Sequence, residues 1–304
     1  MASVEPIIRP RRLKNGDAVT VVAPAGAFDR EALFRGIDVL KSMGFRVHPD
    51  ENLFRQDGYF AGSDAHRAKL LQNGFQDDSF QAIFCARGGY GSMRLLSLLD
   101  WGRIRAHPKV FIGFSDISAL LINLYLRCGL VTFHGPTLNT LADADPQTPP
   151  ALLKALTTDR PVKLEGPETV TLRPGSVTAP VMVGNLTTFC HLVGTPFQPN
   201  FGGHVLLIED TGEALYRIDR MLTQMRLAGC FEEMVGLVLG SFQNCGSQKN
   251  VHDLFERFFR EEKFPMVAGF EFGHEGRNPT LPIGVPATLD ADRRCLTYLE
   301  AATV

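Results

Sequence analysis

Strand-length apolar runs alternate with segments of helical periodicity through the first half of the chain. Strands are predicted at 19–23, 45–48, 82–86, 110–114 and 131–134, and helices at 30–43 and 63–75. Parallel strands need crossover connections, and these are usually helices. The pattern therefore predicts an α/β fold whose N-terminal domain has a mostly parallel sheet flanked by helices on both faces.

The second half has fewer strand–helix alternations and begins after a change in composition. Residues 166–179 are rich in Pro, Gly and Thr, which is typical of a linker. We therefore predict an N-terminal domain at 1–165, a linker at 166–179 and a smaller C-terminal α/β domain at 180–304. Within that second domain the pattern predicts strands at 204–210, 235–242 and 266–270, a helix at 215–227 and a hairpin at 287–299.

Four unusual loops follow predicted strands in the first half. They are Pro24-Ala-Gly26, Arg87-Gly-Gly89, Ser115 and His134-Gly-Pro136. In open α/β sheets, ligands bind beyond the carboxyl ends of the strands. We therefore expect these loops to meet at one edge of the sheet and to form the functional site.

Ser115 stands where an apolar run, Val110 to Ile112, stops at Gly113 and a helical pattern begins. A serine in a tight turn between a strand and a helix exposes its hydroxyl at the edge of the sheet, as a nucleophile requires. Ile117 replaces the second glycine of the G-x-S-x-G elbow, which weakens an α/β-hydrolase interpretation but not a serine nucleophile. The alternative is that Ser115 merely caps a helix.

Composition narrows the class of protein. The chain has 304 residues, of which 44% are hydrophobic and 21% charged, with a net charge of −2. The sequence has no stripe of basic residues that would favour nucleic-acid binding. Its apolar runs are all much shorter than the ~20 residues of a membrane-spanning helix. The six cysteines form no C-x-x-C motif, and the N-terminus has no apolar block of a secretory signal. We expect a cytoplasmic protein with neither metal nor cofactor, because no metal-ligand or dinucleotide motif is present.

A serine nucleophile needs a base to take its proton and a third group to orient that base. His134 and His274 both end predicted strands, and His274 also lies in a glycine-rich loop, Phe272 to Pro279. The sequence favours His274 and leaves His134 open. Glu209 ends an apolar strand and is the best-placed carboxylate. It could instead pair with Arg217 or Arg220 and join its strand to the following helix.

Arg87-Gly-Gly-Tyr-Gly91 follows another predicted strand. Its glycines allow backbone amides to approach a ligand closely, and the arginine can bind a carboxylate. The segment therefore indicates anion binding, although an ordinary glycine turn before a helix would read the same way.

At these residues the chain resembles the LD-carboxypeptidases of peptidoglycan recycling, serine peptidases of family S66. The resemblance runs in family order over nearly the whole chain. Its matching segments are Val22-Ala-Pro-Ala25, Tyr59-Phe-Ala-Gly-Ser63, Arg87-Gly-Gly-Tyr-Gly91, Gly113-Phe-Ser-Asp116, Phe133-His-Gly-Pro136, Gly184-Asn-Leu186, Leu207-Ile-Glu-Asp210, Tyr216-Arg-Ile-Asp-Arg220, Gly240-Ser-Phe242 and Gly273-His274.

The resemblance implies roles for individual residues. Ser115 is expected to be the nucleophile, His274 the general base and Glu209 the acid that orients it. The amides of Gly89 and Asp116 would form an oxyanion hole, and Arg87 is a candidate for binding a substrate carboxylate. The implied substrate is a murein tetrapeptide that loses its terminal D-alanine, and the resemblance also allows a homodimer.

Two other functions stay open at this point. Some members of the superfamily resemble microcin-immunity peptidases, which cleave aminoacyl-sulfamoyl adenosine and tend to carry an aromatic-bearing loop. The single tryptophan, Trp101, lies away from the predicted site, which favours the tetrapeptide. A muropeptide-binding protein without catalysis is the other alternative, and the presence of all three candidate residues argues against it.

Overall fold

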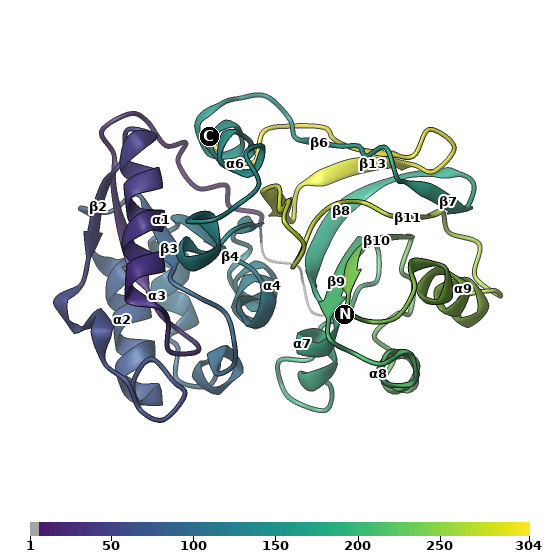
Figure 1. Cartoon of the computed structure of the whole chain (residues 1–304), viewed down its shortest axis with the longest axis horizontal. Coiled ribbons are helices and arrows are strands. Elements are labelled where there is room, and N and C mark those ends of the chain that lie inside the picture. Colours follow the sequence, from purple (N-terminus) through teal and green to yellow (C-terminus); the bar gives the residue numbers. More distant parts are fainter. Residues whose placement is uncertain (1–5) are drawn as a thin grey trace.

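The computed structural model describes residues 6–304 and contains two sheets (Figure 1). The first sheet has six strands in the order β12-β5-β4-β3-β1-β2, and β1 to β5 are parallel. The parallel sheet predicted for the first half is therefore confirmed. Its strands are β1 (Ala18–Val22), β2 (Arg46–Pro49), β3 (Ala82–Cys85), β4 (Val110–Gly113), β5 (Thr132–His134) and β12 (Leu281–Ile283).

Helices cover both faces of this sheet. One face is covered by α1 (Arg30–Ser42), which packs against α5 (Leu138–Leu141). The other is covered by α2 (Asp64–Gln76), α3 (Trp101–Ala106) and α4 (Ser118–Cys128). The helix predicted at 63–75 is confirmed as α2, and the Ser63 side chain caps it by accepting the His66 N–H. Further short segments are η1 (Glu51–Phe54), η2 (Ser92–Leu95), η3 (Ser115–Ile117) and α6 (Thr148–Thr157).

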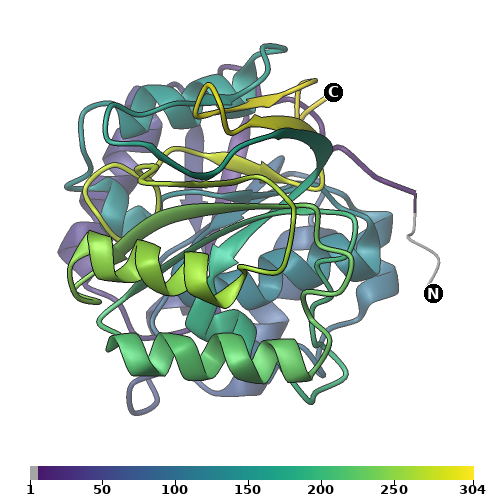
Figure 2. The same cartoon turned by 90° about the vertical axis from the view of Figure 1, so that its right-hand side faces the viewer.

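The second sheet has eight strands in the order β6-β14-β13-β8-β9-β10-β11-β7. The strands β8 to β11 are parallel, and β13 and β14 form the hairpin that the sequence predicts. Figure 2 shows α8 and α9 in front of this sheet. The elements are β6 (Lys163–Leu164), β7 (Val170–Arg173), β8 (Ser176–Asn185), β9 (Val205–Thr211), β10 (Gly236–Gln243), β11 (Met266–Ala268), β13 (Pro286–Asp290), β14 (Cys295–Tyr298), α7 (Leu186–His191), α8 (Leu215–Leu227) and α9 (Gln248–Phe258).

The segment 166–179 differs from the linker that its composition predicts. It contains all of β7, an edge strand, and the first part of β8, which lies inside the second sheet between β13 and β9. The second sheet has eight strands and the first has six, and the strands β6 and β12 each belong to the sheet of the other half. Pro and Thr are compatible with edge strands as well as loops, so composition alone could not distinguish the two.

Two elements join the halves of the molecule. Residues 118–125 of α4 are all buried, because α4 contacts β4 and β5 on one side and β8 and α7 on the other. Strand β12 comes from the second half but pairs antiparallel with β5 in the first sheet. The halves are thus connected by packing and by backbone pairing.

Two helical glycines provide a test of the packing. A Cβ on Gly36 would lie 2.1 Å from the backbone oxygen of Leu138 in α5, whereas a Cβ on the exposed Gly102 of α3 meets only Asp100 Oδ1 at 3.5 Å. We expect Gly36→Ala to lower the free energy of unfolding by about 1–3 kcal/mol. Gly102→Ala should be neutral or stabilising by up to about 1 kcal/mol. Urea unfolding of both variants checks this, and equal effects would contradict it.

Candidate active site

The four predicted loops meet at the carboxyl ends of the parallel strands. The Gly26 N–H donates to Gly88 O at 3.0 Å, and the Gly135 N–H donates to Gly113 O at 3.0 Å. A Cβ on Gly88 would lie 3.0 Å from Ser115 Cβ, so only glycine allows this loop to approach the serine so closely. The expectation that these loops gather at one sheet edge is confirmed.

Ser115 follows β4 with a backbone φ of +62°, a left-handed conformation that is uncommon outside glycine. The turn needs Gly113, because a Cβ there would lie 2.8 Å from Ile117 Cγ2. The Ser115 side chain caps neither η3 nor α4. The structure therefore shows the strained strand-to-helix turn of a nucleophile elbow rather than a capping serine.

Ser115, His274 and Glu209 form a continuous hydrogen-bonded series, although they come from distant parts of the chain. His274 Nε2 lies 3.1 Å from Ser115 Oγ, and His274 Nδ1 lies 2.6 Å from Glu209 Oε2. Glu209 is fully buried at the end of β9, and His274 is partly exposed. Such an arrangement can take a proton from the serine hydroxyl and stabilise the resulting imidazolium.

The loop after β11 is shaped to place His274 on Glu209. Gly273 has a φ of +114°, and a Cβ there would lie 2.5 Å from Glu209 Oε2. The Gly273 N–H donates to Asn278 Oδ1 at 3.1 Å, which holds the loop from its other end. Sequence reasoning noted the glycine-rich loop but did not single out Asn278.

The charge of Glu209 governs the protonation of His274. Burial acts to lower the pKa of His274, but the hydrogen bond and charge of Glu209, together with the charge of Asp210, outweigh it. The pKa of His274 is therefore raised above 6.5.

His134, the other candidate base, lies close to this series but outside it. It is fully buried with its ring edge-on to Phe114 and Phe272, and neither ring nitrogen has a hydrogen-bond partner among the described residues. Burial lowers the pKa of His134 to about 4. His134 does not reach Ser115 as a base.

The alternative ion pairs of Glu209 are also absent from the described part of the chain. Arg217 pairs with Glu213 at 3.6 Å rather than with Glu209. Arg220 instead lies over the ring of Tyr216. The carboxylate of Glu209 is thus free of arginine partners and faces the histidine.

The remaining predicted site residues surround the serine. Gly89 has a φ of +97° and follows Gly88, and Asp116 directly follows Ser115. The Asp116 carboxylate is directed away from the site, where it accepts the Ser92 N–H at 2.8 Å, and burial raises its pKa. Arg87 is exposed and donates one hydrogen bond, to Ala27 O at 2.5 Å.

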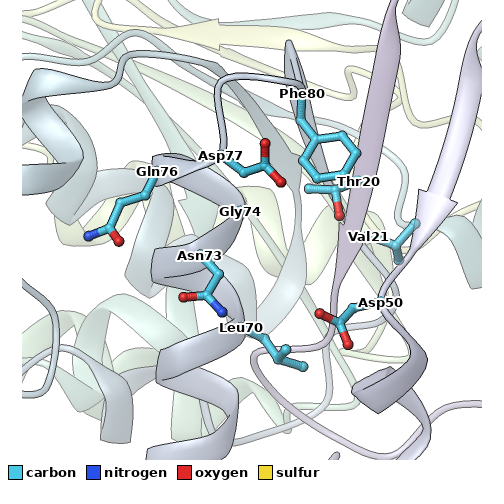
Figure 3. A pocket seen from close by; sticks show the side chains of 9 residues that line it. All are labelled: Thr20, Val21, Asp50, Leu70, Asn73, Gly74, Gln76, Asp77 and Phe80. Carbon is cyan, nitrogen blue, oxygen red and sulfur yellow. The ribbon is translucent and has the colours of Figure 1, made fainter.

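A pocket of about 240 Å³ opens beside His274. Its walls come from both halves of the molecule and include Phe114, Pro136, Thr140, Thr148 and Asn278. A second pocket of about 360 Å³ lies between α2 and strand β1, with Asp50, which follows β2, in its wall (Figure 3). It presents the side chains of Asp50, Asp77 and Phe80 but none of the four loops, so the pocket at His274 is the candidate substrate pocket.

Among residues 6–304, no three His, Cys, Asp or Glu side chains are grouped so that they could hold a metal ion. Within the same residues, no helix has both the length and the apolar character needed to cross a membrane.

Comparison with protein families gives two matches in chain order. Residues 19–135 match the LD-carboxypeptidase N-terminal domain, and residues 178–289 match the LD-carboxypeptidase C-terminal domain, both of peptidase family S66. The first match contains Ser115, and the second contains Glu209 and His274.

Individual proteins are also similar to this chain over nearly their full length. A putative carboxypeptidase of Streptomyces coelicolor is 40% identical, covering 96% of both chains. A probable murein peptide carboxypeptidase of Bacillus subtilis is 34% identical, covering 93% of this chain and 91% of the other. The crystal structure of an MccF-like protein from Bacillus anthracis superposes with a TM-score of 0.91 at 27% identity, covering 96% of this chain and 99% of that one. This chain belongs to the LD-carboxypeptidase family, peptidase family S66.

Proposed function

We propose that this protein is a serine LD-carboxypeptidase that releases the terminal D-alanine of murein tetrapeptides during peptidoglycan recycling. The observation that carries the proposal is the unbroken series Ser115–His274–Glu209, with both hydrogen-bond distances at 3.1 Å or less. The Bacillus subtilis relative named for murein peptides supports the choice of substrate.

In this proposal Ser115 Oγ attacks the carbonyl carbon between diaminopimelate and D-alanine while His274 Nε2 takes its proton. The negative charge of Glu209 stabilises the imidazolium at Nδ1. The tetrahedral intermediate collapses, the C–N bond breaks, and His274 returns the proton to the amine of the departing D-alanine. Water, activated by the same histidine, then hydrolyses the acyl-enzyme.

The amides of Gly89 and Asp116 are proposed to bind the oxyanion. Gly89 follows Gly88, whose backbone approaches Ser115 closely, and Asp116 directly follows Ser115. Free amides aimed at developing negative charge contribute strongly because they need no reorganisation during the reaction. Arg87, whose guanidinium uses one donor on Ala27 O, is proposed to bind a substrate carboxylate with the others.

The pH dependence of the reaction follows from His274. The base must be neutral to accept the serine proton, and its pKa is raised above 6.5. We therefore expect kcat/KM to rise with pH through an apparent pKa above 6.5. A kcat/KM profile between about pH 5 and 9 measures this, and an acid limb below the ordinary histidine value would contradict the role of the Glu209 charge.

Release of D-alanine from UDP-N-acetylmuramoyl tetrapeptide, followed by mass spectrometry with EDTA present, tests the function. Release by the wild type and not by Ser115→Ala supports a metal-independent serine carboxypeptidase. Equal release by both proteins would exclude Ser115 as the nucleophile.

A microcin-immunity type of activity is the second candidate, because a solved structure that superposes with a TM-score of 0.91 is of an MccF-like protein. Trp101 lies beside Phe197, with Arg127 over its ring, and does not line the pocket at His274, so it is not placed to bind a nucleobase there. Turnover of an aminoacyl-sulfamoyl adenosine beside the tetrapeptide decides between them, and preference for the adenosine compound would overturn our choice.

We further propose that the protein acts in the cytoplasm on soluble muropeptides, without nucleic acid or membrane partners. The net charge of −2 and the free, mostly buried cysteines support this. A homodimer stays a prediction from the resemblance.

A further inference from the structure

Asn185 touches the buried carboxylate of the proposed catalytic series on the side away from the histidine. It is the last residue of β8 and lies in register with Glu209 on β9. Its Nδ2 donates to Glu209 Oε1 at 3.2 Å, and the residue is 5% exposed. The two oxygens of Glu209 are thus shared between His274 and Asn185.

The same amide nitrogen also donates to a second carboxylate. Asn185 Nδ2 lies 3.1 Å from Asp210 Oδ1. Asp210 also accepts hydrogen bonds from Thr187 N, Thr187 Oγ1 and Thr211 N, at 2.9, 2.7 and 2.8 Å. Burial and the neighbouring charge of Glu209 raise the pKa of Asp210 to about 6. Asn185 therefore lies between two buried acids that would otherwise repel each other.

The backbone of Asn185 binds the segment that carries the nucleophile. Its N–H donates to Ser118 Oγ at 3.1 Å, and Ser118 begins α4, three residues after Ser115. The contact is close, because a Cβ on the preceding Gly184 would lie 2.9 Å from Ser118 Cβ. One residue is thus bonded both to the carboxylate in the second sheet and to the serine segment of the first.

Asn185 has a separate structural task. It is the N-cap of α7, where its Oδ1 accepts the Thr188 N–H at 2.9 Å. Capping uses the oxygen, and contact with the acids uses the nitrogen. A substitution can therefore separate the two tasks.

We propose that Asn185 is a positioning residue of the reaction: its amide holds the Glu209 carboxylate oriented toward His274, while its backbone fixes the serine segment against the same point. This inference rests on the proposed function of Ser115, His274 and Glu209.

The charges around Glu209 give the direction of the effect. Glu209 faces His274, His134 and Asp210, with Asn185 as the donor on its outer oxygen. Without that donor the negative charge of Glu209 is stabilised less by Asn185 and more by the protonated imidazole. His274 therefore holds its proton more tightly. Asp210 also loses a donor in the variant, and any loss of its charge would lower the pKa of His274. This opposing effect is expected to be smaller, because Asp210 keeps three other donors and does not touch the histidine. The acid limb of kcat/KM should therefore move to higher pH.

The test compares Asn185→Ser with Ser247→Ala. Serine retains an N-cap oxygen and lacks the amide nitrogen. Ser247 caps α9 through the Asn250 N–H, so its alanine variant loses a cap away from the site. We expect Asn185→Ser to keep the cap of α7, to lower kcat about 10- to 100-fold and to shift the acid limb upward. Ser247→Ala should lower Tm and leave both kinetic properties unchanged.

A measurement without substrate separates failure of this inference from failure of the proposed function. The His274 imidazole is titrated by NMR in wild type and Asn185→Ser, and an upward shift is expected in the variant. If wild type releases no D-alanine but the shift appears, the positioning role stands and the substrate assignment fails. Wild-type kcat and unchanged His274 titration in Asn185→Ser would overturn the inference.

Discussion

Replacement of Ser115 by alanine is expected to lower kcat for D-alanine release by roughly four or more orders of magnitude. The hydroxyl is the proposed nucleophile, and His274 and Glu209 serve the reaction only by moving and stabilising its proton. Because the three groups act as a unit, loss of one removes most of the benefit of the others. The measurement is single-turnover release with protein in excess of tetrapeptide.

The unusual backbone at Ser115 supplies a control for this variant. Alanine and glycine both lack the hydroxyl, but only glycine adopts a φ of +62° without strain. Ser115→Gly should therefore be as inactive as Ser115→Ala, while its free energy of unfolding should be higher by about 1 kcal/mol. Retained activity in either variant would mean that another group attacks the substrate.

The second large effect is expected for Glu209→Gln. Glutamine has nearly the same shape but no charge, so it no longer stabilises the imidazolium, and its amide can hold His274 in the wrong tautomer. The corresponding change in a serine protease lowers kcat about 10⁴-fold, and we expect a loss of about 10³- to 10⁴-fold here.

The pH profile of Glu209→Gln distinguishes an electrostatic role from a merely structural one. Glu209 raises the pKa of His274, so its neutral replacement should move the acid limb of kcat/KM to lower pH. This is opposite to the shift expected for Asn185→Ser. The matched control is Glu213→Gln, because Glu213 lies just before α8 and pairs with Arg217. This variant should change neither kcat nor the position of the acid limb. An unshifted limb in Glu209→Gln would count against the proposed base.

Local patterns were sufficient to predict part of this molecule. Apolar runs of strand length gave the parallel sheet, and the sequence around Gly113 and Ser115 predicted the turn because its sterics are local. Glu209 was identifiable because a carboxylate that ends a buried strand needs a partner.

Other features depend on contacts between distant segments. His134 and His274 both end strands, and only the folded chain shows which ring faces Ser115. The antiparallel pairing of β12 with β5, which completes the first sheet from the second half, leaves no local signal. Asn185 reads as an ordinary cap before a helix, and its two acidic partners become visible only when β8 and β9 lie side by side.

Strand β12 and the loop before it also determine when the protein can become active during its synthesis. Ser115 leaves the ribosome 159 residues before His274, which at roughly 5–20 residues per second is a delay on the order of ten seconds or more. Throughout that time the growing chain contains Ser115 but neither the proposed base nor strand β12, which pairs with β5. If His274 is the base, as we propose, the nascent polypeptide cannot cut peptides before residue 274 has been synthesised.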